Sequence, residues 1–151
     1  MYCIGHEAFI TEKDLKNGMC EIHKKQPEII REENWFFRLS KYAKKIKNVL
    51  EKNSIAIIPE SRKHETLSFL REGLQDVSFS RPSKDLSWGI PVPNDATQTV
   101  YVWADALANY LSVVDFGSKK NQFKKMWPPD VQVIGRDILR FHSLIWLGML
   151  M

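Results

Sequence analysis

VYVWADALANY, at residues 100–110, is the stretch that decides the fold. Its first four residues are β-branched or aromatic, which favours a short buried strand. Residues 104–114 then have the composition of a helix. A second strand-like segment, VQVIG at 131–135, leads directly into another helical pattern from Asp137. Strand, helix, strand and helix within about fifty residues predict a parallel α/β unit with right-handed crossovers.

The residues before 98 are organised differently. Residues 1–26 are short, polar and rich in turn formers, with recurring Cys and His. Two helical patterns follow, one after Ser40 and one from Pro59, and residues 77–81 alternate like a half-buried strand. The first helical pattern places four apolar side chains on one face: Tyr42, Ile46, Val49 and Leu50. We therefore expect a domain boundary near residue 98.

Composition narrows the class of protein. Hydrophobic residues make up 44% and charged residues 26% of the 151, as in a soluble globular protein. No apolar run approaches the ~18 residues of a membrane span, and the start of the chain is no signal peptide. We expect a location in the cytoplasm or the mitochondrial matrix, with no membrane partner. The apolar residues 140–151 have no helix stop, which indicates an internal segment of a larger protein.

The net charge of +4 is compatible with an RNA or nucleotide partner. The basic residues gather in two groups, and each has two interpretations: a solvated helix face, or a surface that contacts RNA. The groups are Lys41, Lys44, Lys45, Lys47 and Lys52, and then Lys119, Lys120, Lys124 and Lys125.

Two Cys-x-x-His pairs form the first candidate site. They are Cys3 with His6 and Cys20 with His23. Each pair can reach one ion from a tight turn, and thiolate with imidazole suits tetrahedral zinc. Zn²⁺ here would be structural, because protein ligands would fill all four positions. The alternative is that the cysteines are core residues and the histidines lie at the surface.

The two strand-to-helix corners form the second and third candidate sites. Trp103 and Tyr110 are about two helical turns apart, so both can face one side of the first corner. At the second corner, Ile138, His142 and Trp146 fall at i, i+4 and i+8 on one helical stripe. These residues suit a small apolar pocket with one polar group, although their spacing alone favours core packing.

Two residues at the start of the second corner could contact a ligand. Gly135 allows close approach to the backbone, and Asp137 either caps the helix or accepts hydrogen bonds from ribose hydroxyls. The sequence contains no G-x-S-x-G, no G-x-x-x-x-G-K and no G-x-G-x-x-G, so it lacks the serine-hydrolase, P-loop and dinucleotide patterns.

Four segments, taken together, resemble the methionyl-tRNA synthetases. They are EENWFFRLSKY at 32–42, DLSWGIPVP at 85–93, YVWADALANY at 101–110 and GRDILRFHSLIW at 135–146. They occur in the order and with the spacing of that family, over nearly the whole chain. The resemblance implies a class I synthetase: residues 1–98 would be the later part of its connective-peptide insertion, with a zinc-knuckle-like segment at 1–26. Residues 99–151 would then be part of the second half of its Rossmann-like nucleotide-binding domain.

The resemblance also implies a function and a set of site residues. The parent enzyme would activate L-methionine with ATP and Mg²⁺ to methionyl-adenylate and transfer it to tRNA(Met). Gly135 and Asp137 would hold the ribose. Eight residues would form the methionine side-chain pocket: Trp103, Ala106, Leu107, Tyr110, Ile138, Phe141, His142 and Trp146.

Some features depart from the family pattern. The HIGH-type and KMSKS-type motifs are absent from this sequence, so we expect no amino-acid activation by these residues alone. His6 stands where zinc-bearing members often have Cys, Arg136 stands where Lys is commoner, and Leu147-Gly148 replaces a frequent Pro-Ala. Two rival functions remain: a non-enzymatic zinc- and RNA-binding module, and a class I synthetase for another apolar amino acid.

Overall fold

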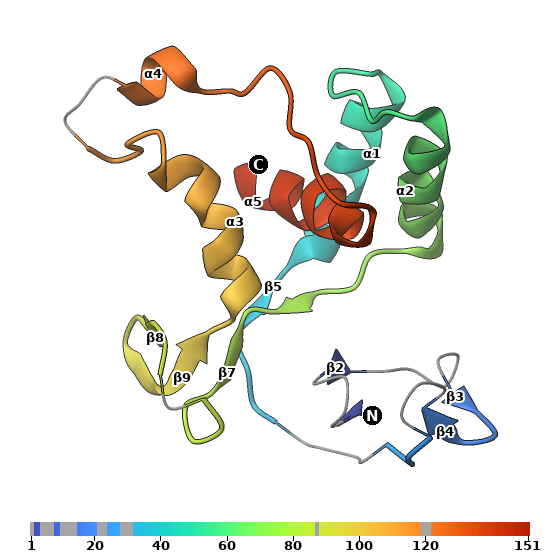
Figure 1. Ribbon diagram of the computed structural model, residues 1–151, viewed down its shortest axis with the longest axis vertical. Coiled ribbons are helices and arrows are strands. Elements are labelled where there is room, and N and C mark those ends of the chain that lie inside the picture. Colours follow the sequence, from blue (N-terminus) through green and yellow to red (C-terminus); the bar gives the residue numbers. More distant parts are fainter. Residues whose placement is uncertain are drawn as a thin grey trace. The chain divides into compact units, whose positions relative to one another are not determined.

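The computed structural model describes residues 2–3, 8–9, 15–20, 24–27, 32–86, 88–118 and 122–151 (Figure 1). The chain forms two compact units, residues 1–33 and residues 34–151. The boundary expected near residue 98 falls inside the second unit and remains a prediction. Within the described ranges, no helix is long and apolar enough to cross a membrane.

The first unit contains two short antiparallel pairs. Strand β1 (Tyr2–Cys3) pairs with β2 (Ala8–Phe9), and β3 (Leu15–Lys16) pairs with β4 (Met19–Cys20). The second pair is closed by Asn17 and Gly18, whose φ angles of 55° and 76° are those of a two-residue hairpin turn. Asn-Gly is the sequence best suited to that turn, because both residues tolerate positive φ.

The second unit begins with a two-stranded pair and two helices. Strand β5 (Phe36–Phe37) pairs with β6 (Val77–Ser78). Between them lie the 3₁₀ helix η2 (Leu39–Tyr42), α1 (Ala43–Glu51) and α2 (Glu60–Glu72). The apolar face predicted from residue 42 onward is confirmed, since Ile46 and Leu50 are fully buried. They belong to a core cluster with Leu39, Leu70, Leu144 and Leu147.

Ser40 contacts Asp76 and does not cap a helix. Its hydroxyl donates to Asp76 Oδ1 over 2.6 Å, and its backbone N–H donates to the same oxygen over 3.1 Å. These hydrogen bonds from Ser40, the hydroxyl first, hold the pKa of the Asp76 carboxyl below its ordinary value. The contact joins the start of η2 to the segment before β6.

A three-stranded sheet precedes the third helix. Its order is β7 (Ser80–Pro82), β9 (Asp95–Val100) and β8 (Pro91–Val92), with both pairs antiparallel. The first predicted strand therefore ends at Val100, and helix α3 (Val102–Ser112) takes in Trp103. The Ala- and Leu-rich helical residues and Asp105 in the first turn favour this earlier start.

The prediction of a second strand at 131–135 is wrong for the described structure. These residues belong to no strand, and Val131 and Val133 are 76% and 94% exposed. The described strand pairs are all antiparallel, so the predicted parallel unit is not formed among them. The physical reason is that β-branched residues favour an extended backbone, but a strand also needs a neighbour for its hydrogen bonds.

The C-terminal part of the second unit is helical. It contains α4 (Gln122–Met126), the 3₁₀ helix η3 (Arg136–Ile138), the π-helix η4 (Phe141–Trp146) and α5 (Leu147–Leu150). In Figure 1 the red C-terminal helix lies between α3 on one side and the α1–α2 pair on the other, as the side-chain contacts also indicate. A Cβ atom at Gly148 would come within 2.8 Å of Leu39 Cδ1 and 3.3 Å of Phe37 Cε1. The glycine thus allows the helix to approach the 37–39 segment closely.

Candidate functional site

Helix α3 carries the first group of predicted site residues. Trp103 lies in its first turn and Tyr110 about two turns later, and both side chains are half-buried. Leu107, between them, is buried at 1% exposure, whereas Ala106 is exposed. The helix therefore places the two aromatic rings along one side, with Leu107 packed beneath.

The segment from 135 to 146 carries the second group. His142 and Trp146 are buried, at 7% and 1% exposure, while Ile138 and Phe141 are half-buried. Their predicted stripe assumed α-helical spacing, but residues 141–146 form a π-helix with i→i+5 hydrogen bonds. His142 and Trp146 nevertheless face the same neighbour, because both rings contact Tyr110. Single π-helical turns occur frequently at functional sites.

The two groups meet through aromatic contacts. Trp103 stacks on Phe141 with ring centroids 4.3 Å apart, and Tyr110 lies 5.6 Å from Trp146. Trp127, which was not among the predicted site residues, adds an edge contact to Trp146 at 6.1 Å. Trp103 and His142 therefore lie at one helix–helix interface, because Trp103 stacks on Phe141 and Tyr110 of the same helix contacts His142.

Two hydrogen bonds determine which ring nitrogen of a neutral His142 carries the proton. Its Nδ1 atom lies 2.9 Å from the carbonyl oxygen of Ile138, and its Nε2 atom lies 2.7 Å from the hydroxyl of Tyr110. A carbonyl only accepts, so Nδ1 must carry the proton. In the neutral imidazole Nε2 is then an acceptor, and Tyr110 donates its hydroxyl proton to it. The imidazole is thus held at both nitrogens.

Trp146 brings an unusual polar atom to the cluster. Its indole Nε1–H is buried and has no hydrogen-bond acceptor among the described residues. A buried donor left unpaired costs about 1–3 kcal/mol, so most folded proteins avoid one. The cluster thus retains a hydrogen-bond donor that no described residue accepts.

Tyr110 also borders a cavity of about 330 Å³. The other residues that line it come from the end of α3 and from the segment 126–133: Val113, Val114, Met126, Trp127, Pro129, Val131, Gln132 and Val133. Of the eight predicted methionine-binding residues, Tyr110 is the one that lines this space. Of the other seven, Trp103, Phe141, His142 and Trp146 make ring contacts at the α3–η4 interface, whereas Ala106 is exposed.

The predicted ribose-binding residues lie just before the π-helix. Asp137 is exposed in the first turn of η3, and no side-chain hydrogen bond caps the helix at Gly135. Gly135 has φ −68°, and an added Cβ would meet only Ile138, at 3.9 Å. The described residues therefore do not themselves require glycine at this position, and Asp137 does not take the capping role that was its alternative.

The predicted zinc ligands fall mostly outside the described residues. His6, His23 and the side chain of Cys3 are not described, whereas Cys20 is buried at 2% exposure at the end of β4. Its backbone forms a turn, with hydrogen bonds of 2.9 Å to Lys25 and 2.7 Å from Lys24. No metal-holding group of three His, Cys, Asp or Glu side chains occurs in the part of the chain that the structure describes. The zinc assignment remains a prediction.

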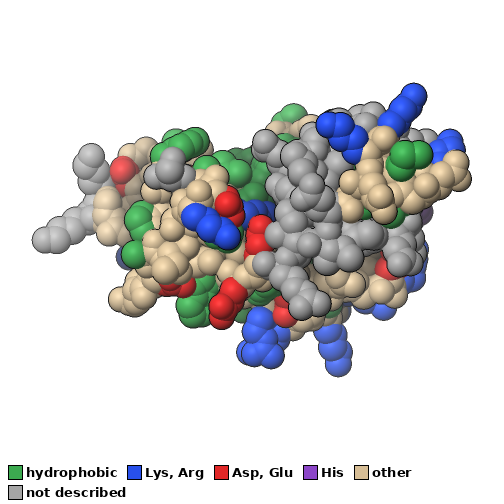
Figure 2. All heavy atoms as spheres, turned by 90° about the horizontal axis from the view of Figure 1, so that it is seen from below, with side chains coloured by type: hydrophobic (Ala, Val, Ile, Leu, Met, Phe, Trp, Pro, Cys, Tyr) green, Lys and Arg blue, Asp and Glu red, His purple; other side chains and the backbone are tan. Residues whose placement is uncertain are grey.

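The basic residues do not form a uniform patch on the face that Figure 2 shows. Acidic side chains are interspersed with lysines and arginines there, and apolar side chains lie among them. On α1, Lys47 pairs with Glu51 at 3.7 Å, as expected of a solvated helix face. This ion pair favours the solvated-face interpretation for α1.

The chain resembles known proteins over nearly its whole length. A family model described as tRNA synthetases class I (M) matches residues 2–151. A methionine–tRNA ligase of Streptomyces coelicolor is 44% identical over 158 residues, covering 99% of this chain and 29% of that protein. A methionine–tRNA ligase of Clostridium perfringens is 46% identical over 153 residues, covering 100% of this chain and 23% of that protein.

A solved structure shares the fold. It is that of Mycobacterium tuberculosis methionyl-tRNA synthetase bound by methionyl-adenylate, with a TM-score of 0.84 and 36% identity. The likeness covers 99% of this chain and 30% of that chain. The fold therefore contains the mixed helices and strands of a class I synthetase, and the chain spans between 23% and 29% of the two curated relatives.

Proposed function

The chain belongs to the class I tRNA synthetases of the methionine family, and on that premise we propose that its part in the chemistry is to hold the methionine side chain. The whole protein would be a methionine–tRNA ligase that forms methionyl-adenylate from L-methionine and ATP, with Mg²⁺, and transfers methionine to tRNA(Met). The observation that carries the proposal is the meeting of Trp103, Tyr110, His142 and Trp146 at one interface.

The chemistry of this interface suits a thioether. Sulfur next to an aromatic ring is a favourable contact of roughly 0.3–1.5 kcal/mol, and the α3–η4 interface offers several rings. The stacked pair of Trp103 and Phe141 would form one wall, and Leu107 would form an apolar base. Tyr110 and His142 would supply the polar groups near the sulfur, each already oriented by its hydrogen bond to the other.

The neighbouring residues suit the nucleotide. Asp137 is exposed at the start of η3, where its carboxylate would accept hydrogen bonds from ribose hydroxyls. Glycine at 135 would leave room for a ligand to approach the backbone. Attack of a carboxylate on the α-phosphorus depends on positioning and charge stabilisation, which we assign to the motifs that this sequence lacks. We therefore expect no ATP–pyrophosphate exchange by these 151 residues alone.

A structural zinc ion would belong to the first unit. Cys20 is buried at the end of a tight hairpin, and a turn of this kind brings two ligands within reach of one ion. Metal analysis of the purified chain and of Cys20→Ser tests this: about one zinc per wild-type chain and a loss in the variant are expected, and a metal-free wild-type chain would contradict it.

Titration with L-methionine tests the pocket. The chain should bind it saturably in roughly the millimolar range, with NMR shift changes at Tyr110, His142 and Trp146. L-norleucine is the matched control, because it replaces the sulfur by a methylene group of similar size. It should bind about two- to tenfold more weakly, the equivalent of one sulfur–aromatic contact.

Two outcomes would contradict the pocket assignment. One is equal affinity for the two amino acids, and the other is a set of shift changes that leaves the α3–η4 interface unaffected. Trp88, which is 78% exposed and lies outside the site, serves as the internal reference and should not respond.

A further inference from the structure

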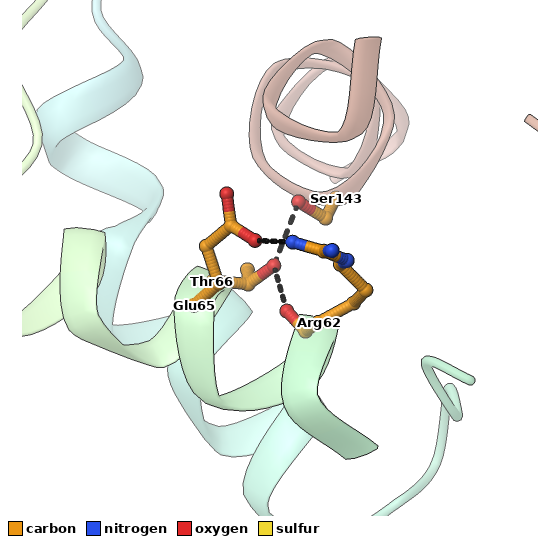
Figure 3. Close-up of polar contacts among 4 residues, drawn as sticks. All are labelled: Arg62, Glu65, Thr66 and Ser143. Carbon is orange, nitrogen blue, oxygen red and sulfur yellow. Dashed lines mark hydrogen bonds and ion pairs between the residues drawn. The ribbon is translucent and has the colours of Figure 1, made fainter. Parts of the chain in front are cut away.

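A pair of buried hydroxyls lies behind the proposed pocket. Thr66 on α2 is fully buried and Ser143 on η4 is 6% exposed, and their oxygens lie 3.2 Å apart (Figure 3). They join segments 77 residues apart in the sequence. Figure 3 shows Ser143 pointing from the C-terminal helix toward α2, whereas the Arg62 side chain is engaged with Glu65 of the same helix.

Each hydroxyl also contacts a carbonyl of its own helix. Thr66 Oγ1 lies 3.0 Å from the Arg62 oxygen, and the Ser143 hydroxyl donates to the Leu139 oxygen over 2.8 Å. Neither group therefore needs the other to avoid an unsatisfied proton. Apolar side chains would fill this interface without the cost of burying hydroxyls. A gain in stability therefore does not explain the two hydroxyls well. A need to hold η4 in one position against α2 explains them better.

Ser143 follows His142 directly, and both side chains form a hydrogen bond to a backbone carbonyl of the preceding turn. His142 Nδ1 donates to the Ile138 oxygen and Ser143 Oγ to the Leu139 oxygen, each four residues back. Hydroxyl bonds of this kind often bend a helix. Here they occur where the π-helix begins, and the π-helix determines where His142 and Trp146 project.

Helix α2 holds the opposite side of this segment from α3. Besides the hydroxyl pair, the Arg140 guanidinium lies 4.4 Å from the centre of the Phe69 ring, and Leu70 belongs to the same core cluster as Leu144. Phe141, His142 and Trp146 meanwhile contact α3. We propose that Thr66 and Ser143 are positioning residues, which hold the start of the π-helix so that His142 presents Nε2 to Tyr110. This inference rests on the proposed methionine pocket.

The test uses the 151-residue chain and two readouts. Long-range ¹H–¹⁵N NMR spectra report which nitrogen of His142 carries the proton, and titration reports the dissociation constant for L-methionine. Thr66→Val removes the hydroxyl with little change in shape. It should give a mixture of the two His142 tautomers and raise the dissociation constant about fivefold, within the range known for indirect coupling.

Two control variants test whether the effect comes from loss of the Thr66 hydroxyl. Thr66→Ser keeps the hydroxyl and should keep the wild-type tautomer and affinity. Ser112→Ala removes a hydroxyl that lies 3.1 Å from the Asn109 carbonyl on the exposed side of α3, and it should change neither readout. Ser143→Ala tests the same contact from the other helix, and it decides the question if Thr66→Val does not fold.

The outcomes separate this proposal from the proposed function. A lower melting temperature with unchanged tautomer and unchanged affinity in the hydroxyl-free variants would show a merely structural pair and overturn the inference. If the wild-type chain binds no methionine, the proposed function of the chain fails, whereas the tautomer still reports whether Thr66 and Ser143 position His142.

Discussion

The helical segment of residues 139–150 has two faces with different chemistry. The face toward α1 and α2 is aliphatic, with Leu144 and Leu147 packed against Ile46 and Leu50. The face toward α3 is aromatic and polar: Phe141 is half-buried, and His142 is held by hydrogen bonds to Tyr110 of α3 and to the Ile138 carbonyl. One helix thus serves the core on one side and the candidate site on the other.

This difference shows how the site is made. The buried hydroxyls on the aliphatic face, those of Thr66 and Ser143, are all hydrogen-bonded, so burial of its leucines is directly stabilising. The aromatic face retains a buried indole N–H of Trp146 without an acceptor among the described residues, which lowers stability. A face that stability alone had shaped would not keep such a group. We therefore expect substitutions on the two faces to separate stability from methionine binding.

The largest effect is expected on the aliphatic face. Leu144 is 2% exposed, and Leu144→Ala should lower the free energy of unfolding by about 2–5 kcal/mol, because it leaves a cavity. Urea unfolding followed by circular dichroism measures it. Leu150→Ala is the matched control, since Leu150 is 42% exposed, and it should cost much less. Similar costs for the two variants would mean that the aliphatic face is not the core.

A smaller effect on stability is expected on the aromatic face. Tyr110→Phe keeps the ring against Trp146 but removes the donor to His142 Nε2, at a cost of about 0.5–1.5 kcal/mol. It should also reduce the preference for methionine over norleucine, which competition titration measures. Tyr42→Phe, on a ring stacked with Phe37 beside the core, should leave that preference unchanged. A preserved preference in Tyr110→Phe would break the proposed division between the faces.

The smallest effect on stability is expected at the exposed contact between Ser40 and Asp76. The hydrogen bonds from Ser40 lower the pKa of Asp76, so they stabilise the fold above the ordinary aspartate pKa. That contribution is lost as the pH falls through the lowered value. It should be small, because the carboxyl is exposed. In Ser40→Ala the pKa of Asp76 should rise toward the ordinary aspartate value, which an NMR titration measures. An unchanged pKa would exclude Ser40 as the cause of the lowered value.

The sequence predicted well those features that depend on local periodicity. The spacing of Ile46 and Leu50 predicted the buried face of α1, and both are fully buried. That prediction succeeded because helical repeat and side-chain character determine which residues share a face. The two aromatic segments also meet, through Trp103 with Phe141 and Tyr110 with His142, but their grouping was implied by the family resemblance and not by periodicity.

The failures concern features that depend on partners. Residues 131–135 have a strand composition, but a strand also requires a neighbouring backbone, which a local pattern does not reveal. The π-helix at 141–146 begins where His142 and Ser143 bond to carbonyls four residues back, and it contacts two other helices, none of which a local pattern reveals. The Thr66–Ser143 pair joins residues 77 positions apart, and although Ser143 falls within the 135–146 segment, no local pattern links it to Thr66. His142 itself was found because it lies within a motif that resembles a known family.

Gly148 sets how deeply the C-terminal helix is seated. With Leu39 Cδ1 only 2.8 Å from the place of an added Cβ, even one methyl group there would lift the helix away from the 37–39 segment or force Leu39 aside. The same helix carries His142 and Trp146, so such a lift would tilt the imidazole and indole relative to α3. The absence of a side chain at Gly148 therefore helps to set the positions of the His142 and Trp146 rings.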